Sequence, residues 1–338
     1  LRDNKREGAA NVGAFATEEL DLGEDWTLSL GARYDAIHYI ARSFINPRLN
    51  DQRTFSRVTP KLGVTWRRSA THTFYANVGG GVEAPAGNET DPASTFGQDT
   101  VYGINPLLDP IRSTTFEVGT KQVVARGTGF VRELAYDVAA YQTNVTNEIV
   151  PYRGGRFYFT AGEARRRGLE LGVSARAAGG LLLESGLTFS DNTYQQYQVD
   201  SVHYNKALAG RVADYSGNKI VGIPDVFGSV AVGLAPSAWR GFSVRVGAQG
   251  FGKYFADDAN AVVVPGYAIL NTTFSLDRPI ALGGGIGLRG FVAVNNLGDR
   301  SYLASAFLNP DVVNNVPVAF EPGLRRNVVV SLALSRTR

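Results

Sequence analysis

The richest group of side chains with binding chemistry lies in one stretch, residues 194–215, which reads YQQYQVDSVHYNKALAGRVADY. Its aromatic and basic members are Tyr194, Tyr197, His203, Tyr204, Lys206, Arg211 and Tyr215. Lysine and arginine hold carboxylates and other anionic groups, and arginine can do so through two parallel hydrogen bonds. Tyrosine offers a flat face and a hydroxyl, which suit planar catecholate or hydroxamate groups. We therefore predict that this stretch contacts a small, oxygen-rich ligand.

Residues of the same chemistry recur in other polar stretches. These further candidates for ligand binding are Arg42, Arg48, Arg53, Tyr102, Arg153 and Arg156. Exposed loops of any protein carry such side chains, so the competing interpretation is that they are only solvated.

Catalytic and metal sites have weaker support. Asp200, Ser201 and His203 are close in sequence, but the members of a hydrolytic triad normally converge from separate elements. The FADDAN segment, with Asp257, Asp258 and Asn260, carries oxygen ligands without the rest of a calcium loop, so we expect a solvated turn. Cysteine is absent and the three histidines are scattered, so no thiolate site or disulfide exists. We predict a protein that is not an enzyme, with no cofactor and no bound metal of its own.

Charge and hydropathy exclude two further classes. The net charge is only +3 and the charges are dispersed without a basic stripe, so nucleic-acid binding is not predicted. No run of about 18 apolar residues occurs, so the sequence encodes no membrane-spanning helix.

The elements that must position these residues are β-strands. In WTLSLGARYDA, residues 26–36, every second side chain is apolar, which is the period of a two-faced strand. The period recurs along the chain, and no stretch of similar length has helical spacing, so the protein is predicted to be all-β. We count about 13 strands, at 11–21, 24–40, 54–68, 71–82, 112–125, 129–151, 157–177, 181–195, 221–235, 239–253, 266–278, 284–296 and 325–335.

The connections between these strands alternate between short and long. Longer loops are expected around 40–54, 83–111, 191–220, 254–265 and 297–324, with a tight one at 153–156. This alternation and the great length of the strands favour an antiparallel, up-and-down transmembrane β-barrel over a soluble β-sandwich. Leu28 and its alternate neighbours would then face lipid, while Arg33 and Asp35 would face a hydrated bore.

Six segments resemble those of TonB-dependent outer-membrane receptors, and they occur in the order of that family. They are 12–35, 57–85 with its GFRxP-like end, 103–121 (NPxLxPE…ExG-like), 160–171 (RGxE-like), 292–305 (VxNLfdxxY-like) and 321–334 (PGxxR-like). Asn105, Pro106, Leu108, Pro110, Glu117 and Gly119 match the third segment, whereas Ile111 replaces its glutamate. The chain also ends in Arg338 rather than the family's usual aromatic residue.

The resemblance implies a larger barrel of about 22 strands that encloses a plug. Residues 1–338 are then the C-terminal portion of that barrel, with no second domain, and the plug is absent from this chain. The start at Leu1 and the lack of methionine are expected of an excised or processed piece.

The resemblance also implies a function and partners. It indicates a receptor in the Gram-negative outer membrane for a ferric siderophore or similar iron chelate, in which iron is present only as cargo. The TonB complex would energise transport through the plug, and outer-membrane lipid and lipopolysaccharide would surround the wall. Haem is disfavoured, because residues 86–104 lack the histidine that haem-binding members place there.

Three alternatives remain open. The same kind of receptor could carry cobalamin, an oligosaccharide or a metal. A passive, porin-like channel would need neither plug nor TonB. A soluble β-sandwich would pack its apolar faces against each other.

Overall fold

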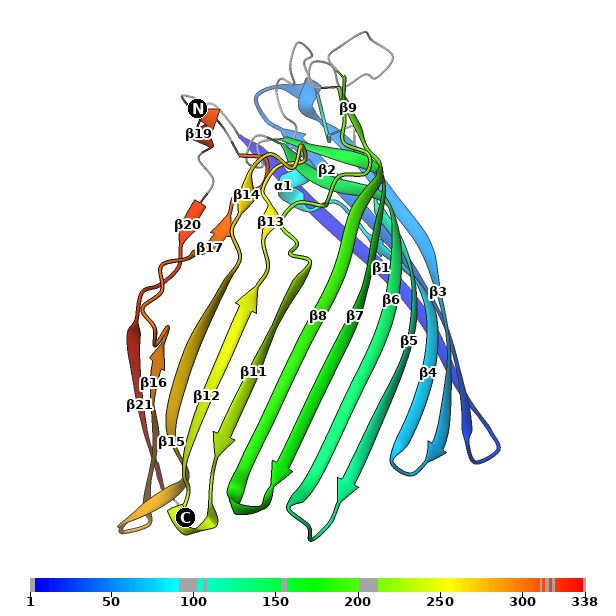
Figure 1. Cartoon of the computed structure of the whole chain (residues 1–338). Coiled ribbons are helices and arrows are strands. Elements are labelled where there is room, and N and C mark those ends of the chain that lie inside the picture. The colour runs from blue at the N-terminus through cyan, green and yellow to red at the C-terminus, as the bar shows by residue number, and fades with distance from the viewer. Residues whose placement is uncertain are drawn as a thin grey trace.

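The fold is a single antiparallel sheet of 13 strands in which each strand pairs with the next one along the sheet (Figure 1). A computed structural model describes residues 4–90, 102–105, 108–152, 157–200, 212–310, 312–313, 316–317 and 320–336. The sheet strands are β1 (Lys5–Leu22), β2 (Trp26–Ser43), β3 (Asp51–Ser69), β4 (His72–Glu83), β5 (Ile111–Arg126), β6 (Val131–Tyr152), β7 (Phe157–Ala177), β8 (Leu181–Gln196), β11 (Val226–Leu234), β12 (Phe242–Phe251), β15 (Tyr267–Gly283), β16 (Ile286–Asn295) and β21 (Asn327–Arg336). The predicted all-β class and strand count are confirmed.

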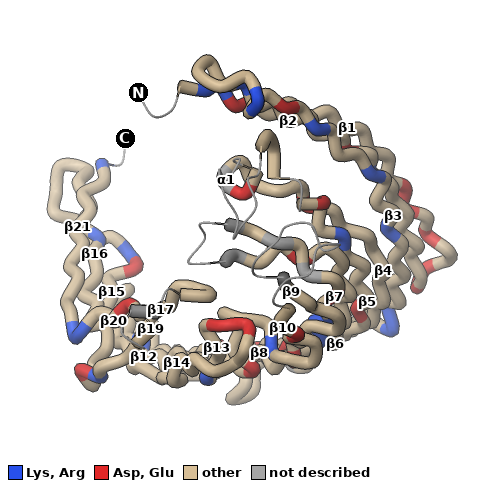
Figure 2. The backbone as a smooth tube through the Cα atoms, turned by 90° about the horizontal axis from the view of Figure 1, so that it is seen from above, with Lys and Arg blue, Asp and Glu red and all other residues tan. Residues whose placement is uncertain are grey.

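The sheet curves around a central space, which we call the bore (Figure 2). Its first and last strands, β1 and β21, are not paired with each other in the described part of the chain. The short helix α1 (Gly87–Thr90) and the strands β9 (Gln198–Asp200) and β10 (Val212–Asp214) lie inside this curve. Among the described residues, no helix has the length and apolar character needed to span a membrane.

The two ends of the sheet differ in their connections, as the sequence predicted. At the end that we call the turn rim, the strands are joined by short turns, such as residues 23–25 and the 3₁₀ turns η2 (Ala178–Gly180) and η3 (Ser237–Trp239). At the opposite end, the loop rim, the connections are long and carry hairpins of their own. These extra elements are η1 (Pro47–Leu49), β9 with β10, β13 (Tyr254–Phe255) with β14 (Val263–Val264), β17 (Leu303–Ala306) with β20 (Phe320–Pro322), and β18 (Val312–Val313) with β19 (Val316–Pro317).

The two faces of the sheet separate as the period of two requires. The register places Leu28 opposite Val64 and Leu30 opposite Leu62 on one face, while Arg33 and Asp35 point to the other. Apolar side chains of the first face stay exposed, and the described residues provide no second sheet to cover them. A β-sandwich is therefore excluded, because it would bury this face. The other face, on which the loops fold, is the bore face.

Aromatic residues mark the turn rim on the exposed apolar face. The rings of Trp26 and Trp66 stack with centroids 5.7 Å apart, and Phe74 continues the stack at 5.5 Å from Trp66. These three residues are cross-strand partners on β2, β3 and β4. Such an aromatic band is typical of the level at which a membrane barrel meets the lipid interface.

One predicted strand begins too early. The strand predicted from residue 221 begins at Val226, because residues 218–225 instead run beside the end of β8. There, Tyr194 N–H donates to the Asn218 carbonyl at 2.9 Å, and Ser190 N–H donates to the Asp225 carbonyl at 2.8 Å. Local periodicity cannot separate this irregular pairing from a regular ladder.

Candidate functional site

The candidate site is the bore side of the loop rim, where loops from distant parts of the sequence meet. A buried carboxylate forms the centre of one half of it. Asp258, in the hairpin of β13 and β14, accepts hydrogen bonds from the hydroxyls of Tyr194 and Tyr197, each at 3.0 Å. It also accepts one from Asn309 Nδ2 at 3.0 Å. We call these four residues the Asp258 clasp.

The clasp joins three loops, namely those after β8, β12 and β16. Asn218 Nδ2 donates to the Asp258 carbonyl at 2.7 Å, which ties the first loop to the second. Asn309 N–H donates to the Ala256 carbonyl at 2.7 Å, and Asp258 N–H donates to Asn309 Oδ1 at 3.0 Å. The loops therefore meet at one side chain, although the partners of Asp258 lie 51 to 64 residues away in sequence.

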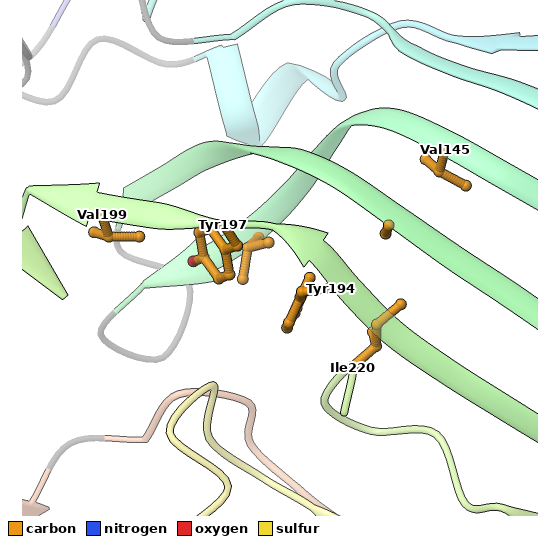
Figure 3. Close-up of a cluster of buried hydrophobic side chains, with 7 residues drawn as sticks. Val145, Tyr194, Tyr197, Val199 and Ile220 are labelled. Carbon is orange, nitrogen blue, oxygen red and sulfur yellow. The ribbon is translucent and has the colours of Figure 1, made fainter. Parts of the chain in front are cut away.

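Apolar packing surrounds the clasp and removes it from water. Tyr194 and Tyr197 are each 1% exposed, with ring centroids 4.7 Å apart (Figure 3). They pack in a cluster with Val145, Val150, Ala164, Val199 and Ile220. Burial raises the pKa of Asp258 to about 6, despite the hydrogen bonds that favour its charged form. The pKa values of both tyrosines are also raised, first by burial and then by the nearby Asp258, so their hydroxyls stay donors.

A second anchor holds the loop between β4 and β5 against the bore face. Arg53 Nη1 donates to the Asn105 carbonyl at 3.2 Å, and its Nη2 lies 3.4 Å from an Asp109 oxygen. Asp51 accepts the backbone N–H of Ile104 at 3.0 Å. We call Asp51, Arg53 and their contacts with Ile104, Asn105 and Asp109 the β3 strap.

The same loop is fixed at its start and within its core. The Tyr39 hydroxyl donates to the Pro85 carbonyl, and Glu89 accepts the Ala86 N–H at 2.7 Å to cap α1. Asn105 is 1% exposed and donates to the Tyr158 carbonyl at 3.1 Å, while Leu108 is fully buried. The NPxL-like residues that the structure describes are therefore structural anchors of this loop.

Charged side chains line the bore face below the loops. Arg33 forms a two-pronged contact with Asp35, and Arg245 pairs with Glu184 at 2.5 Å. Arg166 pairs with Glu148 just under the clasp. A pocket of about 270 Å³ opens near Arg33, Asp35 and Arg57. Such a surface can bind polar or charged groups. Among the described residues, no group of three or more acidic or histidine side chains is placed to hold a metal ion.

Six of the predicted ligand-binding residues lie in the described part of the chain. Arg42 and Arg48 are exposed at the loop rim, where Arg42 lies over the ring of Phe44, and Tyr102 is 48% exposed. Arg53 belongs to the β3 strap, and Tyr194 and Tyr197 are brought together in the clasp. Their contact with a ligand stays a prediction. The other six, Arg153, Arg156, His203, Tyr204, Lys206 and Arg211, fall outside the described residues.

Sequence reasoning missed the centre of the clasp. The FADDAN turn was expected to be solvated, and for Asp258 this is wrong, because the side chain is 5% exposed. Only Asp257 behaves as a local turn residue, since its carboxylate accepts the Val262 N–H at 2.6 Å. No local signal in the sequence distinguishes the buried Asp258 from the turn residue Asp257, because the side chains that donate to Asp258 come from other loops.

Comparison with known proteins agrees with this geometry. The family model described as "TonB dependent receptor-like, beta-barrel" matches residues 2–297. The ferrioxamine receptor of Yersinia enterocolitica is 25% identical over 302 residues, which are 87% of this chain and 36% of that protein. A probable TonB-dependent siderophore receptor PiuA of Acinetobacter baumannii is 22% identical over 315 residues, covering 88% of this chain and 38% of that protein.

A solved structure shows the same fold. The siderophore receptor PiuA from Acinetobacter baumannii superposes with a TM-score of 0.75 at 18% identity, over 98% of this chain and 44% of that one. The chain thus spans less than half the length of these relatives. Because the family model covers most of its residues, this chain belongs to the TonB-dependent receptors and contributes to the wall of their β-barrel.

Proposed function

We propose that the full-length protein is a receptor in the Gram-negative outer membrane that takes up a ferric siderophore or similar iron chelate. The observation that carries the proposal is the match of residues 2–297 to the receptor barrel family. The names of both matched relatives, a ferrioxamine receptor and a siderophore receptor, favour an iron chelate as cargo. Both are named as receptors, which agrees with the expectation that the protein is not an enzyme.

The geometry is compatible with this role. Loops at one rim converge over the bore, where they would meet a cargo that arrives from outside. The exposed apolar face would contact outer-membrane lipid and lipopolysaccharide, while the charged bore face would remain hydrated. We further propose that TonB energises passage of the cargo through a plug domain that lies within the barrel of the full-length protein.

Uptake of radiolabelled ferric chelates tests the proposal. The full-length protein is expressed in a receptor-deficient Gram-negative strain, with and without a functional TonB. We expect uptake of at least one chelate that depends on both the receptor and TonB. Uptake that persists without TonB would instead support a passive channel.

Calorimetry of the purified full-length protein separates the candidate cargoes. The panel contains catecholate, hydroxamate and carboxylate iron chelates, together with cobalamin, an oligosaccharide and free metal ions. Tight binding of one iron chelate is the expected result. Binding of cobalamin, an oligosaccharide or a metal alone, with no response to any iron chelate, would overturn the cargo that we propose.

A further inference from the structure

Three exposed arginines lie along the turn rim between β11 and β21. Arg240 closes the 3₁₀ turn η3, Arg278 lies in the turn-rim part of β15, and Arg336 is the last residue of β21. We call these three residues the arginine arc. None of their side chains forms a hydrogen bond or an ion pair within the part of the chain that the structure describes.

Two members of the arc continue apolar rows on the outer face of the sheet. Every second residue of β21 faces outward, and Leu332 and Leu334 of this row are 74% and 71% exposed. Arg336 is the next member of the row. On β15, Arg278 follows the outward-facing Leu276 at the same spacing.

A bulge beside Arg278 does not reverse its direction. A Cβ added at Gly287 would lie 2.9 Å from Pro279 Cβ and 3.2 Å from Ser335 Oγ, so these three residues share one face. Ser335 follows the outward-facing Leu334 and therefore faces the bore. Pro279 faces the bore with it, and the adjacent Arg278 faces outward.

The arginines of the arc are close enough to repel one another. The Asp277 N–H donates to the Gly241 carbonyl at 2.8 Å, and a Cβ added at Gly241 would lie 2.5 Å from Arg278 Cβ. Arg240 and Arg278 are therefore neighbours at the rim. Only β16 separates β15 from β21, so the backbone that carries Arg336 is about 10 Å from that of β15. Like charges at such spacing are destabilising unless an anion lies between them.

No acidic side chain of these strands shares the outer face with the arc. The sheet strands β11, β12, β15, β16 and β21 contain one acidic residue, Asp277. Its carboxylate accepts the Ser243 hydroxyl at 2.7 Å. Ser243 shares its face of β12 with Arg245, which pairs with Glu184 on the bore face. Asp277 is therefore directed to the bore, and these strands supply no counter-charge on the outside.

The surroundings of the arc indicate what kind of anion would fit. Trp239 is exposed beside Arg240, and Phe242 and Phe274 are exposed on the outer face next to the arc. Arginine at the end of an apolar row can keep its stem in hydrocarbon and place its charge among headgroups. Its guanidinium binds phosphate through two parallel hydrogen bonds. This combination fits a phosphate group that is attached to acyl chains.

We propose that the arginine arc binds the phosphodiester headgroups of anionic phospholipid in the leaflet that meets the turn rim. The inference rests on the membrane location that we propose for the full-length protein, and it adds the lipid class that this rim recognises. A zwitterionic headgroup brings its own cation close to the arginines, so it would relieve less of their repulsion. Inorganic phosphate lacks the acyl chains that would lie along the apolar rows.

Native mass spectrometry of the detergent-solubilised full-length protein tests the proposal with two lipids, phosphatidylglycerol and phosphatidylcholine. The double variant Arg278→Gln/Arg336→Gln removes two charges of the arc from an exposed surface. We expect its Kd for phosphatidylglycerol to rise about twentyfold, or roughly fivefold for each arginine, with less than about a twofold change for phosphatidylcholine. Arg278→Lys/Arg336→Lys keeps the charge and should recover most of the affinity.

Arg176→Gln/Arg289→Gln is the matched control. Both arginines are exposed near the turn rim, but they face the bore, since Arg176 alternates with Ser174, the partner of Glu184, and Arg289 follows Gly287 at the spacing of two. The control should leave both Kd values unchanged. An unchanged Kd for phosphatidylglycerol in the arc variant would overturn the proposal, and so would an equal loss in the control. Displacement of the lipid by millimolar inorganic phosphate would show a site for any phosphate and would also overturn it.

The lipid site and the proposed function can fail separately. Uptake of the ferric chelate is measured for the same variants, and we expect it to equal that of the wild type. If the wild-type protein takes up a chelate but does not prefer phosphatidylglycerol, the lipid site is wrong and the receptor function stands. If it prefers phosphatidylglycerol but takes up no chelate, the proposed cargo is wrong and the lipid site stands.

Discussion

The Asp258 clasp and the β3 strap both hold loops over the bore, but they do so with opposite chemistry. The clasp is a buried carboxylate with three side-chain donors, while the strap is a half-exposed arginine with a carbonyl and an exposed carboxylate. A buried group that loses its partners pays the full cost of desolvation, whereas water can replace the partners of an exposed group. Three loops should therefore open together at the clasp, and the strapped loop should open on its own.

The most damaging change should be Asp258→Ala. It leaves two buried tyrosine hydroxyls and the Asn309 amide without their acceptor, which should weaken local closure by about 3 kcal/mol. Hydrogen–deuterium exchange should accelerate in all three loops of the clasp and remain unchanged in residues 102–105. Asp257→Ala is the control, because that carboxylate caps only its own hairpin. Exchange that rises in one loop alone would contradict the idea of a common anchor.

Crowding at the strap can be tested with Gly103→Ala. Gly103 has φ of +75°, and an added Cβ would lie 2.7 Å from an Asp51 carboxylate oxygen. Alanine is strained in this left-handed conformation and would also displace Asp51, so the loop should be destabilised locally by roughly 2 kcal/mol. The Ile104 and Asn105 amides should then exchange faster. Gly217→Ala, at φ +85° with open space around its Cβ, should show the conformational cost alone. Equal costs at both glycines would mean that Asp51 does not crowd the strap.

The clasp should also respond to pH. The folded-state pKa of Asp258, about 6, lies above its ordinary value of 3.8, so the closed form binds a proton more readily than the open form. Closure is then strongest below about pH 4 and weakens as pH rises through 6. From pH 5 to pH 7.5 the free energy that favours the closed form should fall by roughly 1.4 kcal/mol, which raises the equilibrium constant for opening about tenfold.

Exchange protection at the two pH values, corrected for intrinsic rates, measures this effect. The groups that face Asp258 are Tyr194, Tyr197, Asn309 and the neighbouring Asp257. Burial also raises the pKa of Glu148, so wild type must be compared with Asp258→Asn, which cannot titrate. If the variant keeps the full pH dependence, Asp258 is not its source.

The smallest effect is expected from Arg53→Gln. Its ion pair with Asp109 is long, at 3.4 Å, and the Asp109 side chain is 61% exposed. The variant should lower the local stability of the loop between β4 and β5 by less than about 1 kcal/mol and should leave the other loops unchanged. Arg48→Gln, at the same rim but without a side-chain hydrogen bond among the described residues, should have no effect. A loss as large as that of Asp258→Ala would remove the distinction between the two anchors.

The strands were predictable because alternation is a local signal. The observed bounds of β7, Phe157–Ala177, equal the prediction, and most other strands differ by one to three residues. Larger differences occur where tertiary contacts decide the boundary. β1 begins at Lys5 because it continues to pair with β2, and β15 reaches Gly283 only through register shifts against β16.

The site was less predictable because its partners are distant in sequence. Tyr194 and Tyr197 were selected for the chemistry of their side chains, but nothing near them indicates that Asp258 and Asn309 converge on the same point. The aromatic residues Phe227, Phe251 and Tyr267 are cross-strand partners on β11, β12 and β15, and they left a weak signal, since each lies at or next to a strand end. Their alignment depends on the register of three strands, which a single sequence does not specify.

The aromatic band described at the turn rim has an optical consequence. All three tryptophans of the chain, Trp26, Trp66 and Trp239, lie at that rim, so its indole emission reports on one membrane interface only. No tryptophan lies at the opposite end, so indole emission does not report directly on events there. A single tryptophan introduced among the loops would therefore add a separate signal, while the native residues serve as an internal gauge of insertion depth.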